Sequence, residues 1–184
     1  MIIPETDLEL QIISSEEFKS GASYRSTGRT HPERSVEEHI EQILAFIDLQ
    51  PWATSRERLR LMGLLHDLGK VQVVRDPNGR VVGPGHSLIS EQIARKFTTD
   101  KDLLYDIGIH DKYIHFFRNA ERKRFDPKKF IRVYTPADLD LLTRFNYADS
   151  NSRERDSVCW FEDRCVELNL KEDKIYRSEP NVLS

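Results

Sequence analysis

The sequence predicts an all-α protein built as a single domain with one small β-hairpin. Its length of 184 residues suits one domain. Most of the chain repeats apolar residues every three or four positions, which is the period of a helix with one buried face. Only one short stretch has the strand, turn and strand pattern of a hairpin. Hydrophobic residues make up 38% of the chain, which is enough for one core.

Basic and acidic side chains nearly cancel, with 28 Lys and Arg against 31 Asp and Glu and a formal net charge of −3. This balance excludes a strongly basic nucleic-acid coat and an acidic disordered tail, but it leaves room for a local basic cluster that binds a phosphorylated small molecule. No apolar run approaches the ~18–20 residues of a membrane span, and the N-terminus lacks the pattern of a secretory signal. We interpret the two cysteines, Cys159 and Cys165, as free thiols and expect a cytoplasmic protein without a membrane partner.

The first clear helix is expected after residue 34, and a short capped helix start is expected at residues 14–17. Residues 1–30 form an irregular N-terminal segment, in which Ser14 and Glu17 have the spacing of a capping box. A clear helix begins after Ser35, a good N-cap, and ends before Pro51. Its apolar positions have helical spacing: Val36, Ile40, Ile43, Leu44 and Ile47.

A second helix is predicted over residues 54–68, with Gly69 as its stop. Residues 71–75 and 80–82 flank the turn sequence Asp76-Pro77-Asn78-Gly79, which predicts the small hairpin.

Further helices are predicted over residues 86–97 and 101–110, the latter extending as far as 117 in its longest version. A fifth helix starts near Pro136, and a last one covers residues 153–170. The main domain is thus residues 31–170, followed by a loose tail at 171–184. A polar segment lies between the fourth and fifth helices, with six basic residues in it or just before it: Arg118, Arg122, Lys123, Arg124, Lys128 and Lys129. This group could attract a nucleotide or RNA, but we interpret it as a solvated face.

The residues that carry chemistry gather at the ends of these helices. His66 and Asp67 are adjacent at the polar end of an apolar helix, where they need hydrogen bonds or a metal. An isolated pair of this kind is usually a buried histidine bonded to its neighbours. Here further candidates stand on other helices and can converge inside a bundle: His39, His86, His110 and Asp149.

Mixed imidazole and carboxylate ligands suit Fe, Mn, Co, Ni or Zn, and Mg is a further candidate. The absence of cysteine ligands argues against a structural zinc site.

At these positions the chain resembles the HD-domain superfamily of metal-dependent phosphohydrolases, whose H…HD…D signature matches His39, His66-Asp67 and Asp149. Residues 31–39 (HPERSVEEH) are similar to the opening of the HD domain in bacterial tRNA nucleotidyltransferases, and residues 78–86 are similar to a later segment of it. The resemblance covers about residues 31–155 and implies an HD-domain helical bundle. The residues before it are too few for the nucleotidyltransferase head, so we do not expect transferase activity.

A second branch of the superfamily is also similar. Inositol oxygenase-like di-iron proteins share the order H…HD…H…H…D, and His39-x-x-Gln42, residues 63–71, His110-x-x-Tyr113 and residues 145–153 resemble stretches of that enzyme. This chain lacks the long insertion before the third metal histidine, so the inositol pocket does not carry over.

The resemblance implies a role for each candidate. Asp67 is the natural bridging ligand, since a carboxylate has two oxygens. His39, His66 and Asp149 complete one metal site, and His86 and His110 hold a second metal. If His86 and His110 face solvent instead, the site is mononuclear.

Two basic residues are candidates for contacting the substrate. Lys70 faces the substrate phosphate by resemblance, although a solvated lysine at a helix C-terminus is the alternative. Arg153 is expected to contact the same anion or to lie on the surface. His115 is expected beside the site or on the surface, and not as a ligand.

The leading hypothesis is a metal-dependent phosphohydrolase that cleaves a phosphate ester or anhydride with metal-activated water, with Asp67 and Lys70 as catalytic residues. The expected substrate is a nucleotide, another phosphorylated small molecule or a nucleic-acid end, and this expectation rests on the resemblance alone. The alternatives are an HD-type di-iron oxygenase and a non-catalytic HD module that binds a nucleotide. The sequence leaves the oligomeric state open.

Overall fold

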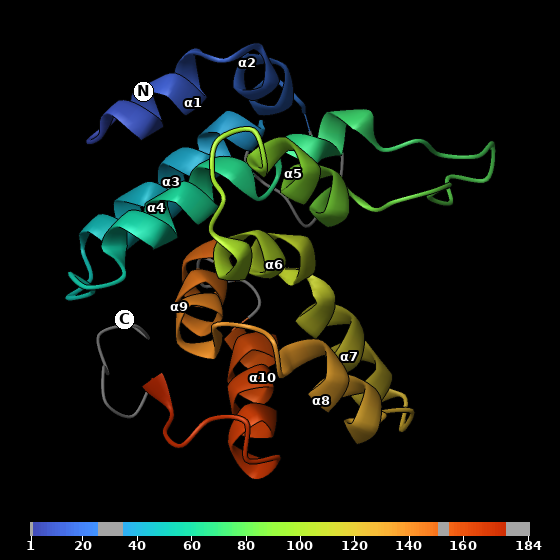
Figure 1. Cartoon of the computed structure of the whole chain (residues 1–184). Coiled ribbons are helices and arrows are strands. Elements are labelled where there is room, and N and C mark those ends of the chain that lie inside the picture. Colours follow the sequence, from blue (N-terminus) through green and yellow to red (C-terminus); the bar gives the residue numbers. More distant parts are fainter. Residues whose placement is uncertain (1, 26–34, 151–154, 176–184) are drawn as a thin grey trace.

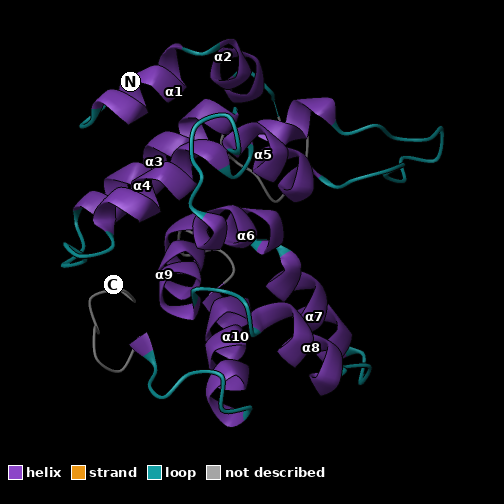
Figure 2. Cartoon of the chain, in the orientation of Figure 1, coloured by secondary structure: helices purple, strands orange, loops and turns teal. Residues whose placement is uncertain are grey.

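The structure is a computed structural model that describes residues 2–25, 35–150 and 155–175. These residues form α-helices, one short 3-10 helix and no sheet, which confirms the predicted all-α class (Figure 2). The helices are α1 (Asp7–Ser14), α2 (Glu16–Ala22), α3 (Val36–Asp48), α4 (Arg56–Leu65), α5 (His86–Ala94), α6 (Lys101–Ile109), α7 (Lys112–Glu121), α8 (Pro127–Tyr134), α9 (Leu139–Ser150) and α10 (Arg155–Glu167), and the 3-10 helix η1 spans Leu68–Gln72.

Helix α4 is the central element of the bundle. It packs against α3, α5, α6 and α9, and α1 contacts it from the N-terminal side. Every residue from Leu59 to Leu65 is buried, as expected for a helix with neighbours on all sides. Figure 1 shows α1 and α2 above α3 and α4, with α7, α8 and α10 below α6 and α9.

The N-terminal segment is more regular than expected, because residues 7–22 form α1 and α2, and only the start of α2 was anticipated by the capping pattern at residues 14–17. The Ser15 side chain accepts the Phe18 N–H at the start of α2, so Ser15 and not Ser14 is the N-cap. Ile12 and Phe18 enter the common core. The segment therefore packs as part of the bundle.

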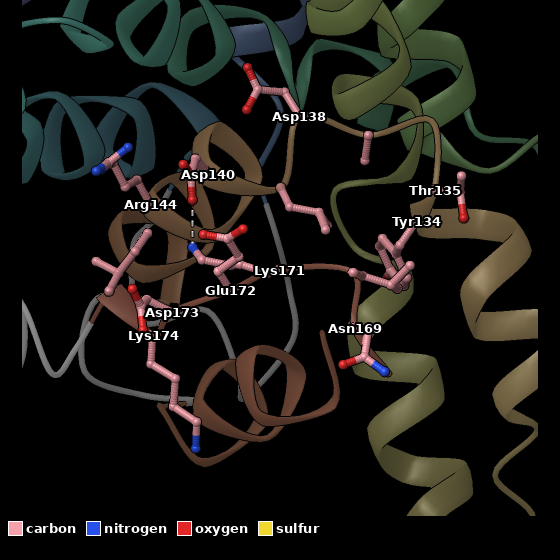
Figure 3. Close-up of a pocket in the computed structure, with 14 residues that line it drawn as sticks. Tyr134, Thr135, Asp138, Asp140, Arg144, Asn169, Lys171, Glu172, Asp173 and Lys174 are labelled. Atoms are coloured by element: carbon pink, nitrogen blue, oxygen red, sulfur yellow. Dashed lines mark ion pairs between the residues drawn. The ribbon is translucent and has the colours of Figure 1, made fainter. Parts of the chain in front are cut away.

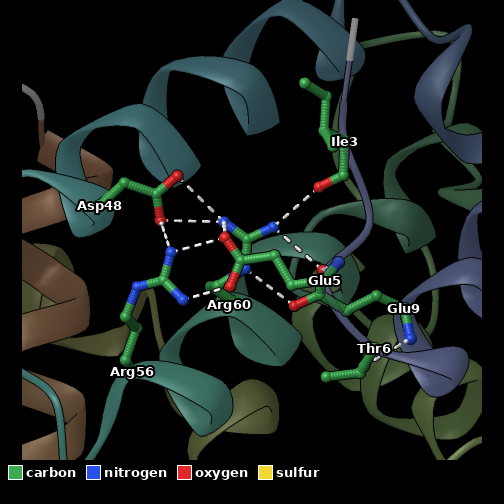
Figure 4. A network of polar contacts seen from close by, with 7 residues as sticks. All are labelled: Ile3, Glu5, Thr6, Glu9, Asp48, Arg56 and Arg60. Atoms are coloured by element: carbon green, nitrogen blue, oxygen red, sulfur yellow. Dashed lines mark hydrogen bonds and ion pairs between the residues drawn. The ribbon is translucent and has the colours of Figure 1, made fainter.

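A buried ion-pair network joins this segment to α4 (Figure 4). Arg60 donates two parallel hydrogen bonds to the Glu9 carboxylate, at 2.8 and 2.9 Å, and its third nitrogen donates to Asp48 at 2.9 Å. The Ile3 carbonyl accepts a further bond at 3.1 Å. Arg60 and Glu9 are 2% and 1% exposed, so each side chain is the other's main polar partner inside the core.

The small hairpin does not form as predicted. A turn is present, in which the Asp76 side chain accepts the Asn78 and Arg80 N–H groups, but only one bridge, between Arg75 and Val81, connects the two arms. The expected first strand partly belongs to η1. Val74 and Val82 are more than half exposed, so no core holds the arms as strands.

Several helix boundaries differ from the prediction, and each of them lies beside a candidate ligand or a capping side chain. The second helix ends at Leu65 and not at residue 68, and the fourth breaks at His110 before α7 begins. Helix α8 was not predicted, although Asp126 caps it and Pro127 occupies its first position. Helix α9 starts after Asp138, whose side chain accepts the Leu141 N–H, and not at Pro136.

The expected loose tail is anchored over residues 171–175. Ile175 is 4% exposed, and its N–H donates to the Glu162 carboxylate at 2.5 Å. Lys171 pairs with Asp140 at 2.7 Å and lies 3.4 Å from Glu162. Residues 176–184 lie outside the described residues.

Two further sequence expectations concern the cysteines and membrane spans. Cys159 and Cys165 are free thiols in the structure. Among the described residues, no helix has the length and apolar character needed to cross a bilayer.

One buried carboxyl group lies away from both the ion-pair network and the candidate metal ligands. Asp106 on α6 is fully buried, and neither of its oxygens has a hydrogen-bond partner. Burial raises the pKa of this carboxyl to about 8, and the nearby Asp138 carboxylate adds to the shift. Asp106 is therefore protonated in the folded protein at neutral pH.

Replacing Arg60 with Met should lower the free energy of unfolding by about 3–5 kcal/mol, because Glu9 is left buried without its partner. The double variant Arg60→Met/Glu9→Leu should recover most of the loss. Urea unfolding monitored by circular dichroism measures both. As a control, Arg56→Met removes a pair that is about one-third exposed and should cost less than 1 kcal/mol. A small effect of Arg60→Met, or no recovery in the double variant, would contradict the role of the network.

Replacing Asp106 with Asn should stabilise the protein at pH 8 by on the order of 5 kcal/mol. The unfolded chain releases this proton near pH 4, while the folded chain keeps it until about pH 8. The folded state thus binds more protons between these values, and the contribution of Asp106 to stability falls as the pH rises through that range. The difference between variant and wild type, from urea unfolding at pH 5 and pH 8, should grow accordingly. The exposed carboxyl of Asp102 on the same helix is the control: Asp102→Asn should give no such pH-dependent difference.

Candidate metal centre

The site begins where the central helix ends. His66 is the residue after α4, and its Nδ1–H donates to the Gly63 carbonyl at 3.0 Å. Carbonyls in the last turn of a helix lack backbone donors, so the imidazole supplies one. This bond places the proton on Nδ1 and leaves the lone pair on Nε2. Nε2 is buried without a hydrogen-bond partner, which is the state of a side chain prepared for a metal ion.

His110 repeats this arrangement at the end of α6. Its Nδ1–H donates to the Ile107 carbonyl at 2.8 Å, three residues earlier, as in His66. Its Nε2 therefore also carries the lone pair, and it lies 3.9 Å from Asp67 Oδ1. The two rings meet edge to face with centroids 5.2 Å apart.

The Asp67 carboxylate lies at the centre and faces a different group with each oxygen. Oδ2 lies 3.3 Å from His66 Nε2, 3.9 Å from His39 Nε2 and 2.5 Å from Lys70 Nζ. Oδ1 lies 3.4 Å from His86 Nε2 and 3.9 Å from His110 Nε2. The side chain is 3% exposed, so these neighbours replace water around the charge.

His39 and Asp149 complete the Oδ2 side. His39 lies in the first turns of α3 and Asp149 in the last turn of α9, and the His39 Nε2 to Asp149 Oδ1 distance is 2.8 Å. Asp149 Oδ1 is also 3.7 Å from His66 Nε2. Two side chains 110 residues apart in sequence thus meet beside His66.

Gly69 brings His86 to the other side. A Cβ on Gly69 would lie 2.4 Å from the His86 carbonyl and 2.7 Å from the Ser90 nitrogen, distances that no side chain tolerates. The bare backbone allows α5 to press against η1, where the Gly69 N–H donates to the Ser90 hydroxyl at 2.8 Å. Gly69 thus serves close packing and does not stop α4, contrary to the sequence expectation.

Phe145 forms an apolar wall behind the imidazoles. Its fully buried ring lies edge to face against His66 and His110, at centroid distances of 5.1 and 6.2 Å. This contact excludes water from one side of the site and holds both rings in place. The electrostatic interactions within the site are stronger as a result.

The charges of the site follow from these contacts. Burial acts to raise the pKa of the Asp67 and Asp149 carboxyls, but the surrounding imidazoles, with Lys70 beside Asp67, hold both values well below their usual range. Burial lowers the pKa of His86, and the neighbouring His110 lowers it further. Burial also acts to lower the pKa of His39, but the hydrogen bond to Asp149 and the charges of Asp149 and Asp67 together outweigh it and raise the value. The carboxylates are thus ionised, as metal ligands must be.

The donor set fits divalent metal ions. His39, His66 and Asp149 form one group, and His66, Asp67 and His110 form another, with the ligand atoms of each group within 4.8 Å of one another. Two nitrogen or oxygen atoms on one ion at ~2.1 Å each can be at most ~4.2 Å apart. The imidazole nitrogen to carboxylate oxygen distances in the two groups, between 2.8 and 3.9 Å, lie within this limit.

The structure therefore brings the six side chains expected as ligands together, with five of them around Asp67. Lys70 lines the same cleft, which has a volume of about 180 Å³. Arg153, expected to contact substrate, lies outside the described residues, as do residues 31–34 of the matching N-terminal stretch. His115 also lines the cleft and is exposed, as expected for a residue beside the site.

Two residues of the cleft were not recognised from the sequence. The Asp111 carboxylate lies 3.9 Å from His86 Nε2, and Arg118 lines the cleft from α7. A sequence signal for Asp111 existed: His110-Asp111 repeats the His66-Asp67 dipeptide at a second helix end. The sequence pattern groups Arg118 with the solvated basic face.

A larger pocket of about 790 Å³ lies elsewhere, between the α8–α9 junction and residues 169–175 (Figure 3). Its charged side chains pair with neighbours, as Lys171 does with Asp140 and Lys174 with Asp163. None of the six candidate ligands lines it. We therefore assign the chemistry to the smaller cleft.

Comparison with known proteins agrees with this geometry. No curated protein and no solved structure matches the chain significantly. A family model of the HD domain matches residues 31–142, which include five of the six candidate ligands and end before Asp149. The match does not distinguish the nucleotidyltransferase branch from the oxygenase branch. Since it covers more than half of the chain, the chain belongs to the HD domain family, whose members are in general metal-dependent phosphohydrolases.

Proposed function

We propose that this protein is a phosphohydrolase that uses two divalent metal ions to cleave a phosphate ester or anhydride. The observation that carries the proposal is the two-sided environment of Asp67. One oxygen faces His39 and His66, and the other faces His86 and His110. A carboxylate so placed can bridge two ions, and a mononuclear site gives the second pair of imidazoles no function.

His39, His66 and Asp149 would hold one ion with Asp67 Oδ2, and His86 and His110 would hold the other with Oδ1. Asp111, 3.9 Å from His86, stands on the second side. Fe, Mn, Co or Ni suits this mixture of imidazole and carboxylate, and Mg is a further candidate. When bound, such ions neutralise phosphate oxygens and lower the pKa of a water molecule.

The chain supplies the remaining positive charge of the cleft. Lys70 is 18% exposed at its side chain and lies 2.5 Å from Asp67, so its ammonium borders both the ligands and the open cleft. Arg118 and His115 line the same cleft from α7. These groups can bind and orient an anionic substrate, which favours a phosphate compound over a neutral substrate of a di-iron oxygenase.

The metal content of variants tests the binuclear site. Wild-type protein purified without chelator should carry two metal equivalents per chain. His86→Ala and His110→Ala should each lose one equivalent and most activity, while Asp67→Ala should lose both. The exposed His115 is the control, and His115→Ala should keep both metals. Inductively coupled plasma mass spectrometry gives the counts. One metal per chain in wild type, unchanged in the His86 and His110 variants, would contradict a binuclear site.

Hydrolysis of 4-nitrophenyl phosphate with added Mn²⁺, Co²⁺, Ni²⁺ or Mg²⁺ tests the reaction itself. Wild-type protein should release nitrophenol in a metal-dependent way. Lys70→Ala should lower kcat about 100-fold or more at unchanged metal content, since it removes one charge that contacts the phosphate. The exposed Lys101→Ala is the control and should behave as wild type. Metal-dependent oxygen consumption with a polyol, and no hydrolysis of any phosphate ester, would identify the oxygenase instead.

A further inference from the structure

A basic surface extends from the cleft, where Arg118 lies, along the second half of α7 and through the following loop to the start of α8. We define this basic surface by its exposed cationic residues: Arg118, Arg122, Lys123, Arg124, Lys128 and Lys129. Within the described chain, none of these side chains forms an ion pair with a carboxylate. Their charge is therefore available to a ligand, unlike that of Arg56, Arg58 and Arg60, which are held in ion pairs.

Three of these lysines stand where the fold itself disfavours them. Lys123 has φ 57° in the loop that closes α7, with its N–H bonded to the Ala120 carbonyl and the Arg124 N–H bonded to the Asn119 carbonyl. This is the turn in which glycine is preferred, since a Cβ strains the left-handed conformation. Lys128 and Lys129 lie in the first turn of α8, where the helix dipole favours negative charge. Folding stability does not account for these charges.

The basic surface is continuous with the metal cleft. Helix α7 begins directly after His110-Asp111, and Asp111, His115, Arg118 and Arg122 recur at three to four residues, which places them on one stripe of the helix. The first three line the cleft. Figure 1 shows α7 leading away from α6 toward α8. The stripe thus connects the ligands to the lysines over the ~15 Å of a ten-residue helix.

Half-buried aromatic rings lie among the basic residues. Phe117 and Phe125 each contact Trp160 of α10, with ring centroids 5.8 and 5.3 Å apart. All three side chains keep part of their surface exposed. Aromatic faces beside unpaired cations are the features with which proteins bind single-stranded nucleic acid, since bases stack on the rings while phosphates contact the cations.

We propose that the basic surface binds the phosphodiester backbone of a single-stranded nucleic acid, and that a terminal phosphate of the same strand enters the metal cleft. The strand follows α7, with its phosphates on the basic residues and a base at the aromatic cluster. A duplex fits less well because its bases stay stacked and cannot reach the rings. Only the position of the terminal phosphate rests on the proposed hydrolase function, since strand binding requires no metal.

Fluorescence anisotropy with fluorescein-labelled dT12, over a series of KCl concentrations, tests strand binding. Lys128→Gln/Lys129→Gln should weaken binding at least tenfold in 0.1 M KCl. It should also reduce the slope of log K against log[KCl] by about 1.4, since each phosphate contact contributes about 0.7 on a single strand. The control Lys19→Gln/Lys101→Gln removes the same charge from exposed sites on α2 and α6 and should leave both quantities near wild type. Equal effects of the two double variants would overturn the proposal.

Lys123→Gly separates binding from folding. Glycine relieves the left-handed backbone and should raise Tm by about 2–4 °C, while the loss of one charge weakens dT12 binding. A more stable variant with unchanged affinity would exclude Lys123 from the strand path. Binding of a 12-base-pair duplex, or of vesicles rich in phosphatidylserine, as tightly as dT12 would overturn the assignment to single strands.

The two proposals fail in different ways. If 4-nitrophenyl phosphate is not hydrolysed but dT12 binding depends on Lys128 and Lys129, the hydrolase proposal fails and the strand-binding surface stands. If hydrolysis is normal in wild type and dT12 does not bind, the reverse holds. In the variant Lys128→Gln/Lys129→Gln, hydrolysis of 4-nitrophenyl phosphate should be unchanged, because that substrate is too small to reach α8.

Discussion

The buried carboxylate of Asp67 is the constraint on which the rest of the molecule depends. A carboxylate that is 2% exposed stays ionised only if cations or hydrogen-bond donors replace the water around it. The chain meets this requirement with groups from several elements, and each group stands at or near a helix end. His66 follows α4, His110 follows α6, His86 begins α5, and Asp149 lies in the last turn of α9. The bundle therefore directs its helix ends at one point.

The helix ends themselves determine how the imidazoles are presented. His66 and His110 use Nδ1 to satisfy carbonyls that no backbone amide reaches, so the same bond that caps each helix also aims Nε2 at the site. A single hydrogen bond from Nδ1 thus both caps the helix and orients the imidazole. A further contact, the bare backbone of Gly69 against α5, determines how closely His86 approaches Asp67. The residues that directly follow His66 and Asp67 therefore also shape the site: Gly69 allows the close packing, and Lys70 supplies a positive charge.

The sequence predicted that the candidate ligands converge, because they occur in a recognisable order and each stands at the edge of an apolar repeat. It could not predict contacts that depend on how the helices pack. The Arg60–Glu9 pair joins positions 51 residues apart, and nothing in the local pattern around Glu9 distinguishes it from a solvated glutamate. The burial of Asp106 likewise depends on how the helices pack, and the sequence around it does not indicate it. The missed helix α8 is a different case: its capping residues, Asp126 and Pro127, were visible, but the surrounding charges suggested a polar loop.

The interpretation of the basic residues shows why net charge is a weak guide to a partner. The whole chain is slightly acidic, and that balance does exclude a protein coated with positive charge. Yet residues 112–133 hold eight basic side chains against two acidic ones, so their field has the opposite sign to that of the remaining chain. Several acidic groups elsewhere are held in ion pairs: Glu9 and Asp48 with Arg60, and Asp100 and Asp138 with Arg58. These ion pairs neutralise charge in the rest of the bundle. Among the described residues, the side chains of the basic surface on α7 and α8 form no such pairs. In the proposed binding mode, a strand that reaches the cleft along α7 would contact the lysines of α8 first, then Arg118, and its terminal phosphate would lie at Lys70 beside Asp67.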